Sequence, residues 1–184
     1  MSLLALRRAA AALRAGGVIA YPTEAVWGLG CEPRNREAVA NLLVLKQRDW
    51  RKGLILIAAD FEQLRPFVAD VGRARLKPAL ATWPGAVTWL LPAAAQAPHW
   101  ITGGRDQIAV RVTAHAPAAA LCLEYGGAIV STSANLARRP PARTLMRLRR
   151  NFGGQLDFIL PGELGGLGGP TPIHELATGR ILRG

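Results

Sequence analysis

The sequence predicts an α/β fold with a mixed parallel and antiparallel sheet. Short apolar runs, often rich in β-branched residues, recur along the chain, and stretches with helical spacing separate several of them. A further observation is a C-terminal segment with the pattern of two short paired strands. The strands predicted before that segment occupy residues 18–21, 54–58, 86–91, 108–112, 128–131 and 158–160.

Helices are expected between these strands, at residues 2–14, 36–47, 61–67, 71–81, 117–125 and 143–150. The first has apolar residues near helical spacing and ends at the pair Gly16-Gly17. Pro117 suits the first turn of its helix, where a backbone N–H is not needed. At the C-terminus, PIHELATGRILRG predicts two strands around Thr178-Gly179 that form an antiparallel pair.

The glycine-rich stretch 162–170 has no Lys-Ser or Lys-Thr after it, so it does not match a phosphate-binding P-loop. We expect a flexible surface loop there.

At 184 residues and 19.6 kDa, the chain fits one domain, residues 1–184. No apolar run reaches the roughly 18 to 20 residues of a membrane span, and arginines interrupt the N-terminal segment. These features indicate a cytoplasmic protein.

The net charge and the few residues of metal-ligating types limit the kinds of ligand that this chain is expected to bind. Two cysteines and three histidines form no ligand cluster, so the sequence indicates free thiols and no zinc site. The net charge of +11 favours polyanionic partners such as nucleotides or RNA. The alternative is that arginine is simply the default base of this chain, which has 20 Arg and 3 Lys, and that the charge is scattered over the surface.

The stretch IAYPTEAVWGLG, residues 19–30, carries the first candidate site. Pro22 should end the pairing of its strand and leave Thr23 and Glu24 outside the sheet. Gly28 and Gly30 would let the backbone pass close to a ligand, and open α/β sheets bind ligands where strands end. The alternative is a threonine that caps the next turn beside an incidental Gly-x-Gly.

The stretch LLVLKQRDWRKGLILIAA, residues 42–59, places Lys46, Arg48, Arg51 and Lys52 between a predicted helix and a predicted strand. Cations commonly complement the dipole at a helix C-terminus, which is one interpretation. The other is that they converge on phosphate or carboxylate oxygens. Two of the three lysines of the chain lie here, which indicates that a compact ammonium is wanted.

The stretch GGAIVSTSANLARRPPART, residues 126–144, runs from an apolar strand into hydroxyl and amide side chains: Ser131, Thr132, Ser133 and Asn135. Arg138, Arg139 and Arg143 follow. These polar groups can bind phosphate or ribose, or can build a local turn. Taken together, three strand ends with hydroxyls and cations favour one anion-binding cleft.

Five segments in order resemble the YrdC-like family of threonylcarbamoyl-AMP synthases, in its short bacterial TsaC type. They are AYPTEAVWGLG, LLVLKQR with KGLILIAA, WPGAVTWLLPA, IAVRVTAHAPAAALC and IVSTSANL, and the similarity runs from about Gly17 to Leu182. The resemblance implies a YrdC-like α/β fold with a twisted sheet and a large basic concave surface. It also implies a reaction in which L-threonine, bicarbonate and ATP give L-threonylcarbamoyladenylate and pyrophosphate for tRNA modification.

The resemblance also implies site residues. The Lys-x-Arg motif of the family falls on Lys46 and Arg48, the expected catalytic pair. ATP is expected to contact this pair and Lys52, Thr88, Ser133 and Asn135, and threonine to contact Thr23 and Arg111. No metal ligand of the protein is implied, because Mg²⁺ would be carried on the phosphates of ATP.

The family pattern is not matched everywhere, because many relatives have a Ser-Gly pair where this chain has Ala137-Arg138. The partners implied are ATP, L-threonine, bicarbonate and downstream threonylcarbamoyl-transfer proteins, with tRNA or another structured RNA as a further candidate and no membrane. The alternative function is a non-catalytic module that binds structured RNA, for which the same positive charge would serve.

Overall fold

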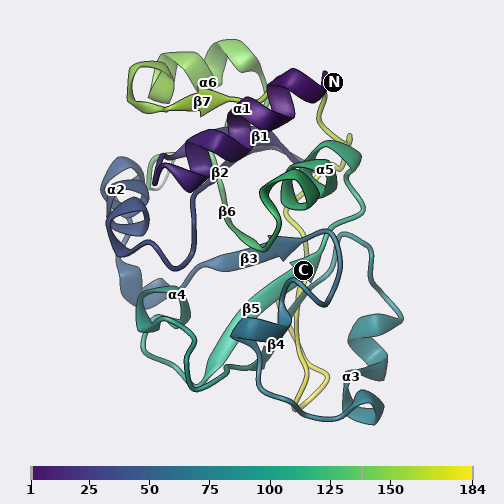
Figure 1. Cartoon of the computed structure of the whole chain (residues 1–184). Helices are drawn as coiled ribbons and strands as arrows, with labels where there is room; N and C mark the ends of the chain where they lie inside the picture. Colours follow the sequence, from purple (N-terminus) through teal and green to yellow (C-terminus); the bar gives the residue numbers. More distant parts are fainter. Residues whose placement is uncertain (1, 138, 184) are drawn as a thin grey trace.

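The computed structural model describes residues 2–137 and 139–183, which form one mixed sheet flanked by helices (Figure 1). The sheet order is β7-β1-β2-β6-β3-β5-β4-β8-β9. The pairs β1/β7, β3/β5 and β4/β8 are parallel, and the other neighbouring pairs are antiparallel. This arrangement confirms the predicted α/β class with a mixed sheet. The strands are β1 (Ile19–Pro22), β2 (Trp27–Gly30), β3 (Ile55–Ala58), β4 (Thr88–Pro92), β5 (Gln107–Val112), β6 (Ile129–Ser133), β7 (Phe158–Ile159), β8 (Ile173–Glu175) and β9 (Ile181–Arg183).

The helices match five of the predicted segments. They are α1 (Leu3–Arg14), α2 (Arg36–Lys46), α3 (Arg73–Leu80), α4 (His99–Thr102), α5 (Ala116–Tyr125) and α6 (Leu145–Phe152), with short 3₁₀ turns η1 (Trp50–Lys52), η2 (Arg65–Phe67) and η3 (Gly153–Gln155). The helix predicted at 61–67 is wrong, because only η2 forms there, around Pro66, which has no N–H to donate. The short helix α4 and the strand β2 were not predicted.

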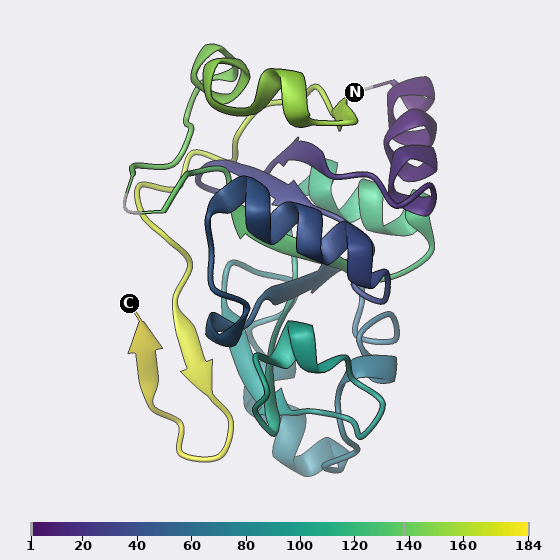
Figure 2. The same ribbon diagram turned by 90° about the vertical axis from the view of Figure 1, so that its left-hand side faces the viewer.

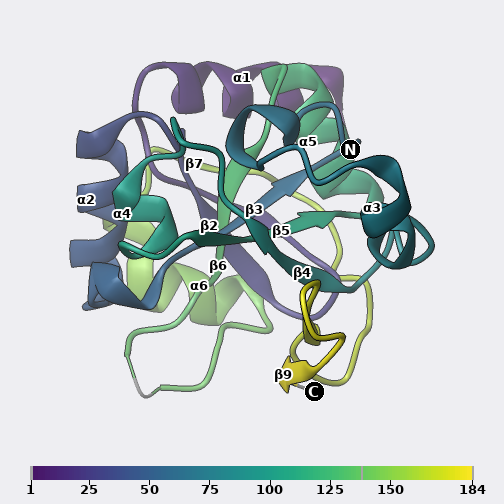
Figure 3. The same cartoon turned by 90° about the horizontal axis from the view of Figure 1, so that it is seen from below.

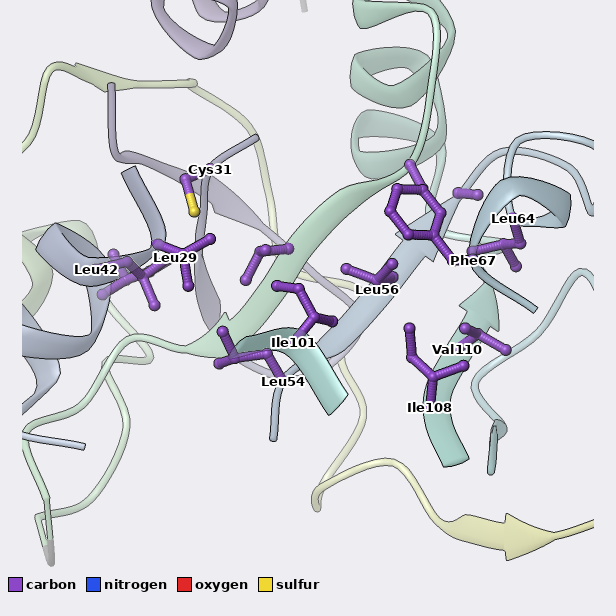
Figure 4. Close-up of a cluster of buried hydrophobic side chains, with 14 of the residues drawn as sticks. Leu29, Cys31, Leu42, Leu54, Leu56, Leu64, Phe67, Ile101, Ile108 and Val110 are labelled. Carbon is purple, nitrogen blue, oxygen red and sulfur yellow. The ribbon is translucent and has the colours of Figure 1, made fainter. Parts of the chain in front are cut away.

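Alternate residues of the strands feed two apolar cores on opposite faces of the sheet. In β3, Leu56 belongs to the larger core and Ile57 to the smaller one, as the period of two in a strand requires. The larger core includes Leu42 of α2 and Ile101 of α4, and Figure 4 shows it around Leu56. Each large aliphatic side chain buried in this way stabilises the fold by about 1.5 to 3 kcal/mol.

Helices α1 and α5 pack against each other on the opposite face and cover the smaller core. Figure 3, seen from below, separates this helix pair from α2 and α4 on the other side of the sheet. Leu13 and Leu121 of the helices meet Ile19 and Tyr21 of β1 in this core. The same face of the sheet also carries polar residues, because Arg111 pairs with Ile57 and Ser131 pairs with Ile55, and the candidate site lies there.

The first candidate stretch forms a hairpin between β1 and β2. Pro22 is the last residue of β1 and pairs with Trp27, so the strand pairing ends at this proline as expected. Thr23 and Glu24 lie in the turn outside the sheet, as expected. Gly30 is needed for packing, since a Cβ there would lie 2.5 Å from the carbonyl oxygen of Val130 and 2.8 Å from the Tyr21 ring. Gly28 and Gly30, expected to bring the backbone close to a ligand, thus lie in a strand in which Gly30 makes room for an aromatic ring.

The glycine-rich segment lies on the surface, as predicted, and crosses the β1–β2 turn. We call residues 162–171 the strap. Its Gly165 N–H donates to the Thr23 carbonyl at 3.0 Å, and its Leu167 N–H donates to the Glu24 carbonyl at 2.9 Å. Arg143 donates to the carbonyls of Leu167 and Gly168. After the strap, β8 and β9 form the predicted antiparallel pair, visible at the edge of the molecule in Figure 2.

Cys31 and Cys122 are free and buried. Burial raises the pKa of both thiols above their ordinary value, so they stay protonated. Among residues 2–137 and 139–183, no group of His, Cys, Asp and Glu side chains has the arrangement of a metal site. No helix in the same residues is long and apolar enough to cross a membrane.

Candidate functional site

Two adjacent cavities lie at the polar end of the sheet and have Arg48 and Ser133 in both linings. The strand cavity has a volume of about 160 Å³ and the cationic cavity about 180 Å³. The strand cavity is lined by Thr23, Ala25, Val26, Gly28, Arg48, Leu54, Ile55, Arg111, Ser131, Thr132, Ser133, Pro170 and Thr171. The cationic cavity is lined by Lys46, Gln47, Arg48, Lys52, Ser133, Asn135 and Ala137. A ligand that occupied both would pass between Arg48 and Ser133.

The way α2 ends places Arg48 at this junction. Gln47 adopts a left-handed backbone with φ 52°, and the Arg48 N–H donates back to the Leu43 carbonyl at 2.9 Å. The chain therefore reverses, and the Arg48 side chain leaves the helix axis. Its Nη2 donates to the Gly53 carbonyl at 2.9 Å, which ties the guanidinium to the start of the next strand. Arg48 is thus held in place before any ligand binds.

Lys46 is buried and connects α2 to the segment that follows β6. Its Nζ donates to the carbonyl oxygens of Ser133 and Asn135 and to Oδ1 of Asn135 at 3.3 Å. Burial, assisted by the charge of Arg48, lowers the pKa of Lys46 to about 8. The ammonium therefore shapes the wall of the cationic cavity in addition to supplying charge there.

The Ser-x-Asn segment completes that wall. The Ser133 hydroxyl is exposed and donates to Asn135 Oδ1 at 2.6 Å. The Asn135 amide donates to the carbonyls of Leu136 and Arg139, each at 3.0 Å. The Asn135 side chain therefore holds the local turn together, while the Ser133 hydroxyl keeps access to solvent. Both interpretations offered by the sequence, a local turn and a polar cavity wall, apply to this segment.

A buried ion pair lies behind the strand cavity. Arg111 of β5 donates from Nη2 to Oε2 of Glu24 at 3.2 Å and from Nη1 to the Thr171 hydroxyl at 2.9 Å. The Thr113 hydroxyl donates to Oε1 of Glu24 at 2.6 Å. Glu24 does not line the cavity, whereas Arg111 and Thr171 do. The charge of Arg111 is therefore largely offset by a carboxylate on the side away from the cavity.

The remaining predicted residues divide into two groups. Thr23 lines the strand cavity, and its hydroxyl also donates to the Val26 carbonyl at 2.7 Å, as a turn cap would. Lys52 is exposed on η1 and lines the cationic cavity. Thr88 lines neither cavity and is fully buried in β4. Its position therefore does not support the predicted contact with ATP.

The three candidate stretches meet in space, as the sequence predicted. Thr23 from the first, Arg48 from the second and Ser133 from the third all line the strand cavity. Arg139 and Arg143 line neither cavity, and Arg138 lies outside the described residues. That the cavities bind anions remains a prediction.

The sequence did not single out Glu24 and Thr171 as site residues. Thr171 is the last residue of the strap and reaches Arg111 from 60 residues away in the sequence, so no local pattern marks it. Glu24 was expected only to lie outside the sheet. A buried carboxylate beside a buried arginine is recognisable in three dimensions but not from spacing. Ser131, noted for its hydroxyl, lies on β6 and lines the strand cavity.

A family model matches residues 11–184: Sua5_yciO_yrdC, described as telomere recombination. Among curated relatives, the threonylcarbamoyl-AMP synthase of Halorhodospira halophila is 57% identical over 178 residues, which cover 97% of this chain and 93% of the relative. The threonylcarbamoyl-AMP synthase of Stenotrophomonas maltophilia is 54% identical over 185 residues and covers both chains completely.

Among solved structures, that of P. abyssi Sua5 complexed with L-threonine has a TM-score of 0.88 and 31% sequence identity to this chain. The alignment covers 96% of this chain and 52% of that one, so this chain spans about half the length of Sua5. These similarities extend over the segments that form both cavities.

Proposed function

The chain belongs to the Sua5/YciO/YrdC family, and from this premise we propose that it is a threonylcarbamoyl-AMP synthase. The reaction joins L-threonine, bicarbonate and ATP into L-threonylcarbamoyladenylate and pyrophosphate. One observation carries the assignment in this chain: two cavities of different character share Arg48 and Ser133. A reaction between two anionic substrates needs such a junction.

The strand cavity is assigned to L-threonine. Its volume of about 160 Å³ is small compared with the roughly 300 to 1,000 Å³ of sites for drug-sized ligands, which suits a small amino acid. Ala25, Val26 and Leu54 supply apolar surface for the methyl group. Arg111 offers donors for the carboxylate, and Thr23 offers a hydroxyl oxygen.

The cationic cavity is assigned to the phosphates of ATP. Lys46, Arg48 and Lys52 contribute positive charge there, and Ser133 contributes a hydroxyl. Charge-assisted hydrogen bonds from such groups are the usual means of holding phosphate oxygens. Asn135 acts on ATP through the Ser133 hydroxyl and the wall of the cavity.

The nucleophile comes from the substrates. The threonine amine combines with bicarbonate to form a carbamate and water, and a carbamate oxygen then attacks the α-phosphorus as the bond to pyrophosphate breaks. The protein has to align the two anions and stabilise the charge that develops on the phosphoryl oxygens. Arg48 lies at the junction where these two groups would meet, so we assign it the main catalytic role. Lys46 supports it by fixing the opposite wall.

Magnesium is assigned to the triphosphate and not to the protein. Neither cavity has an Asp or Glu side chain among its described lining residues. A magnesium ion would therefore be held by phosphate oxygens and water, which is a common arrangement for this ion. It would offset phosphate charge during the displacement, while Arg48 and Ser133 orient the phosphate oxygens.

RNA is a further proposed partner. Residues 126–155 contain six arginines and no Asp or Glu, and Arg149 and Arg150 of α6 are exposed. This segment is the best candidate for the basic surface that the sequence predicts. A single-domain synthase in the cytoplasm would use it near tRNA or near the proteins that transfer the threonylcarbamoyl group. The same charge would also serve a non-catalytic RNA-binding module, but the relatives named threonylcarbamoyl-AMP synthase favour the enzyme over that alternative.

A pyrophosphate-release assay separates the two functions. With ATP, L-threonine, bicarbonate and magnesium present, the synthase should release pyrophosphate, and omission of threonine or bicarbonate should abolish release. Degassed buffer is required, because dissolved carbon dioxide would replace bicarbonate. No release with all components present, or full release without threonine, would contradict the proposal.

A further inference from the structure

Glu24 has a buried carboxylate that does not line the strand cavity but contacts Arg111, which does. Its side chain lies between the guanidinium of Arg111 and the hydroxyl of Thr113, and these three residues are 7%, 5% and 1% exposed. Its backbone carbonyl accepts the Leu167 N–H of the strap. Glu24 therefore joins the β1–β2 turn, strand β5 and the strap at one point.

The orientation of the Arg111 guanidinium depends on few partners. Among the described residues, Arg111 Nε has no hydrogen-bond partner, and neither has the buried hydroxyl of Thr88. The register of β4 and β5 pairs Trp89 with Val110, so Thr88 lies opposite Arg111 on the same face of the sheet. Because no described residue bonds to Nε, the hydrogen bonds to Glu24 and Thr171 determine where the guanidinium points.

Charge gives Glu24 a second effect. The cationic cavity has Lys46, Arg48 and Lys52 in its lining and no described carboxylate, so it attracts polyanions. The strand cavity shares Arg48 with the cationic cavity, but the positive charge of its own cation, Arg111, is offset by Glu24 at 3.2 Å, while Arg111 keeps unused N–H donors. A guanidinium whose charge is offset in this way recognises a carboxylate more by the direction of its N–H donors than by net charge.

We propose that Glu24 is a positioning and specificity-determining residue of the synthase: it orients Arg111 toward the threonine carboxylate and keeps phosphate groups out of the strand cavity. The inference rests on the proposed function. It explains why a buried ion pair is present at all, since such pairs contribute little net stability compared with apolar residues of similar size. Glu24 touches neither substrate and acts through Arg111.

The test compares three variants with the parent protein. Glu24→Gln keeps the shape and removes the charge, and Thr113→Val keeps the charge and removes one hydrogen bond to Glu24. Glu163→Gln is the matched control, because it removes an exposed carboxylate from the strap. For each protein, calorimetry gives the affinities for L-threonine and for ATP. The two titrations are repeated with added pyrophosphate to show whether it competes with either ligand. A melting curve shows that the protein is folded.

We expect Glu24→Gln to weaken threonine binding by about tenfold or more, the scale of a lost hydrogen bond to a charged group, and ATP binding by less than twofold. Pyrophosphate should then compete with threonine, which it should not do in the parent. Thr113→Val should weaken threonine binding severalfold without this competition, and Glu163→Gln should change neither. This new competition is a result that a purely structural role would not produce.

Unchanged threonine affinity in Glu24→Gln, equal losses of threonine and ATP affinity, or no gain of pyrophosphate competition would each overturn the inference. The binding measurements do not depend on whether the protein catalyses the reaction. A parent protein that binds threonine but releases no pyrophosphate would contradict the proposed function, and the competition by pyrophosphate in direct binding would still decide the role of Glu24. A parent that binds no threonine would overturn both.

Discussion

Replacement of Arg48 by lysine should disable the enzyme although the charge is kept. Arg48 lines both cavities and its Nη2 already donates to the Gly53 carbonyl at 2.9 Å. A guanidinium can keep that bond and still present a planar pair of donors to a ligand. An ammonium is a compact point charge on a flexible stem, so Arg48→Lys retains the attraction to phosphate and loses the alignment.

The size of the loss follows from the number of aligned donors removed. Arg48 is the residue assigned to the oxygens that gain charge in the transition state, so its replacement removes one preorganised donor pair. Removal of one such donor typically costs about 3 kcal/mol, which corresponds to a decrease in kcat of roughly a hundredfold. Folding stability should change much less, because the site lies at the surface of the sheet and the apolar cores are untouched.

The assay is pyrophosphate release at saturating ATP, threonine and bicarbonate. Arg51→Lys is the matched control: its side chain is 74% exposed, pairs with Asp49 at 2.9 Å and lines neither cavity. It should keep kcat within about twofold, since surface ion pairs of this kind contribute little. If Arg48→Lys also keeps kcat within a few-fold of the parent, Arg48 is only a helix-end cation and the reaction occurs elsewhere.

Ser133→Ala should weaken ATP binding by roughly 1.5 to 3 kcal/mol with little change in the melting temperature, because the hydroxyl is exposed; a stability loss with ATP affinity preserved would contradict this. Asn135→Ala should lower the free energy of unfolding by about 1 to 3 kcal/mol in a denaturant titration, because its side chain bonds Lys46 and two carbonyls; an unchanged midpoint would refute that role. The kcat/KM for ATP should fall as pH rises through about 8, where Lys46 loses its proton, and Lys46→Met should lack this alkaline limb. The same lowered pKa makes the unfolded chain bind more protons above pH 8, so the contribution of Lys46 to stability should rise from about pH 8 to 10.5, the opposite of the activity trend. RNA binding should weaken steeply with salt, and the double variant Arg149→Gln/Arg150→Gln should reduce the slope by about one to two; salt-independent binding would argue against phosphate contacts.

The sequence was sufficient to predict the class of the fold and the meeting of three distant stretches at one site. The strand within residues 54–58 is buried on both faces, and a strand of that kind appears in the sequence as a short continuous apolar run. The convergence of Thr23, Arg48 and Ser133 was predictable because polar residues that follow neighbouring strands share one edge of the sheet.

What the sequence missed depends on contacts between distant residues. Strand β2 was not predicted, and the role of Gly30 in it depends on the ring of Tyr21, which lies where a Cβ of residue 30 would be. The pairing of Arg111 with Glu24 joins residues 87 positions apart. The contact of Thr88 with ATP, expected from family resemblance, stays a prediction, and the sequence did not indicate that this side chain lies buried in β4, opposite Arg111 on the sheet. Local spacing carries no information about any of these three arrangements.

The most direct test of the proposed synthase activity is the mass of the reaction product. The protein is incubated with ATP, L-threonine and ¹³C-bicarbonate with magnesium, and the products are separated and weighed by mass spectrometry. A threonylcarbamoyl-AMP synthase should form an adduct of AMP and threonine joined through a single labelled carbonyl carbon, in step with pyrophosphate. Pyrophosphate without this adduct, or an adduct of AMP and threonine without the labelled carbon, would contradict it.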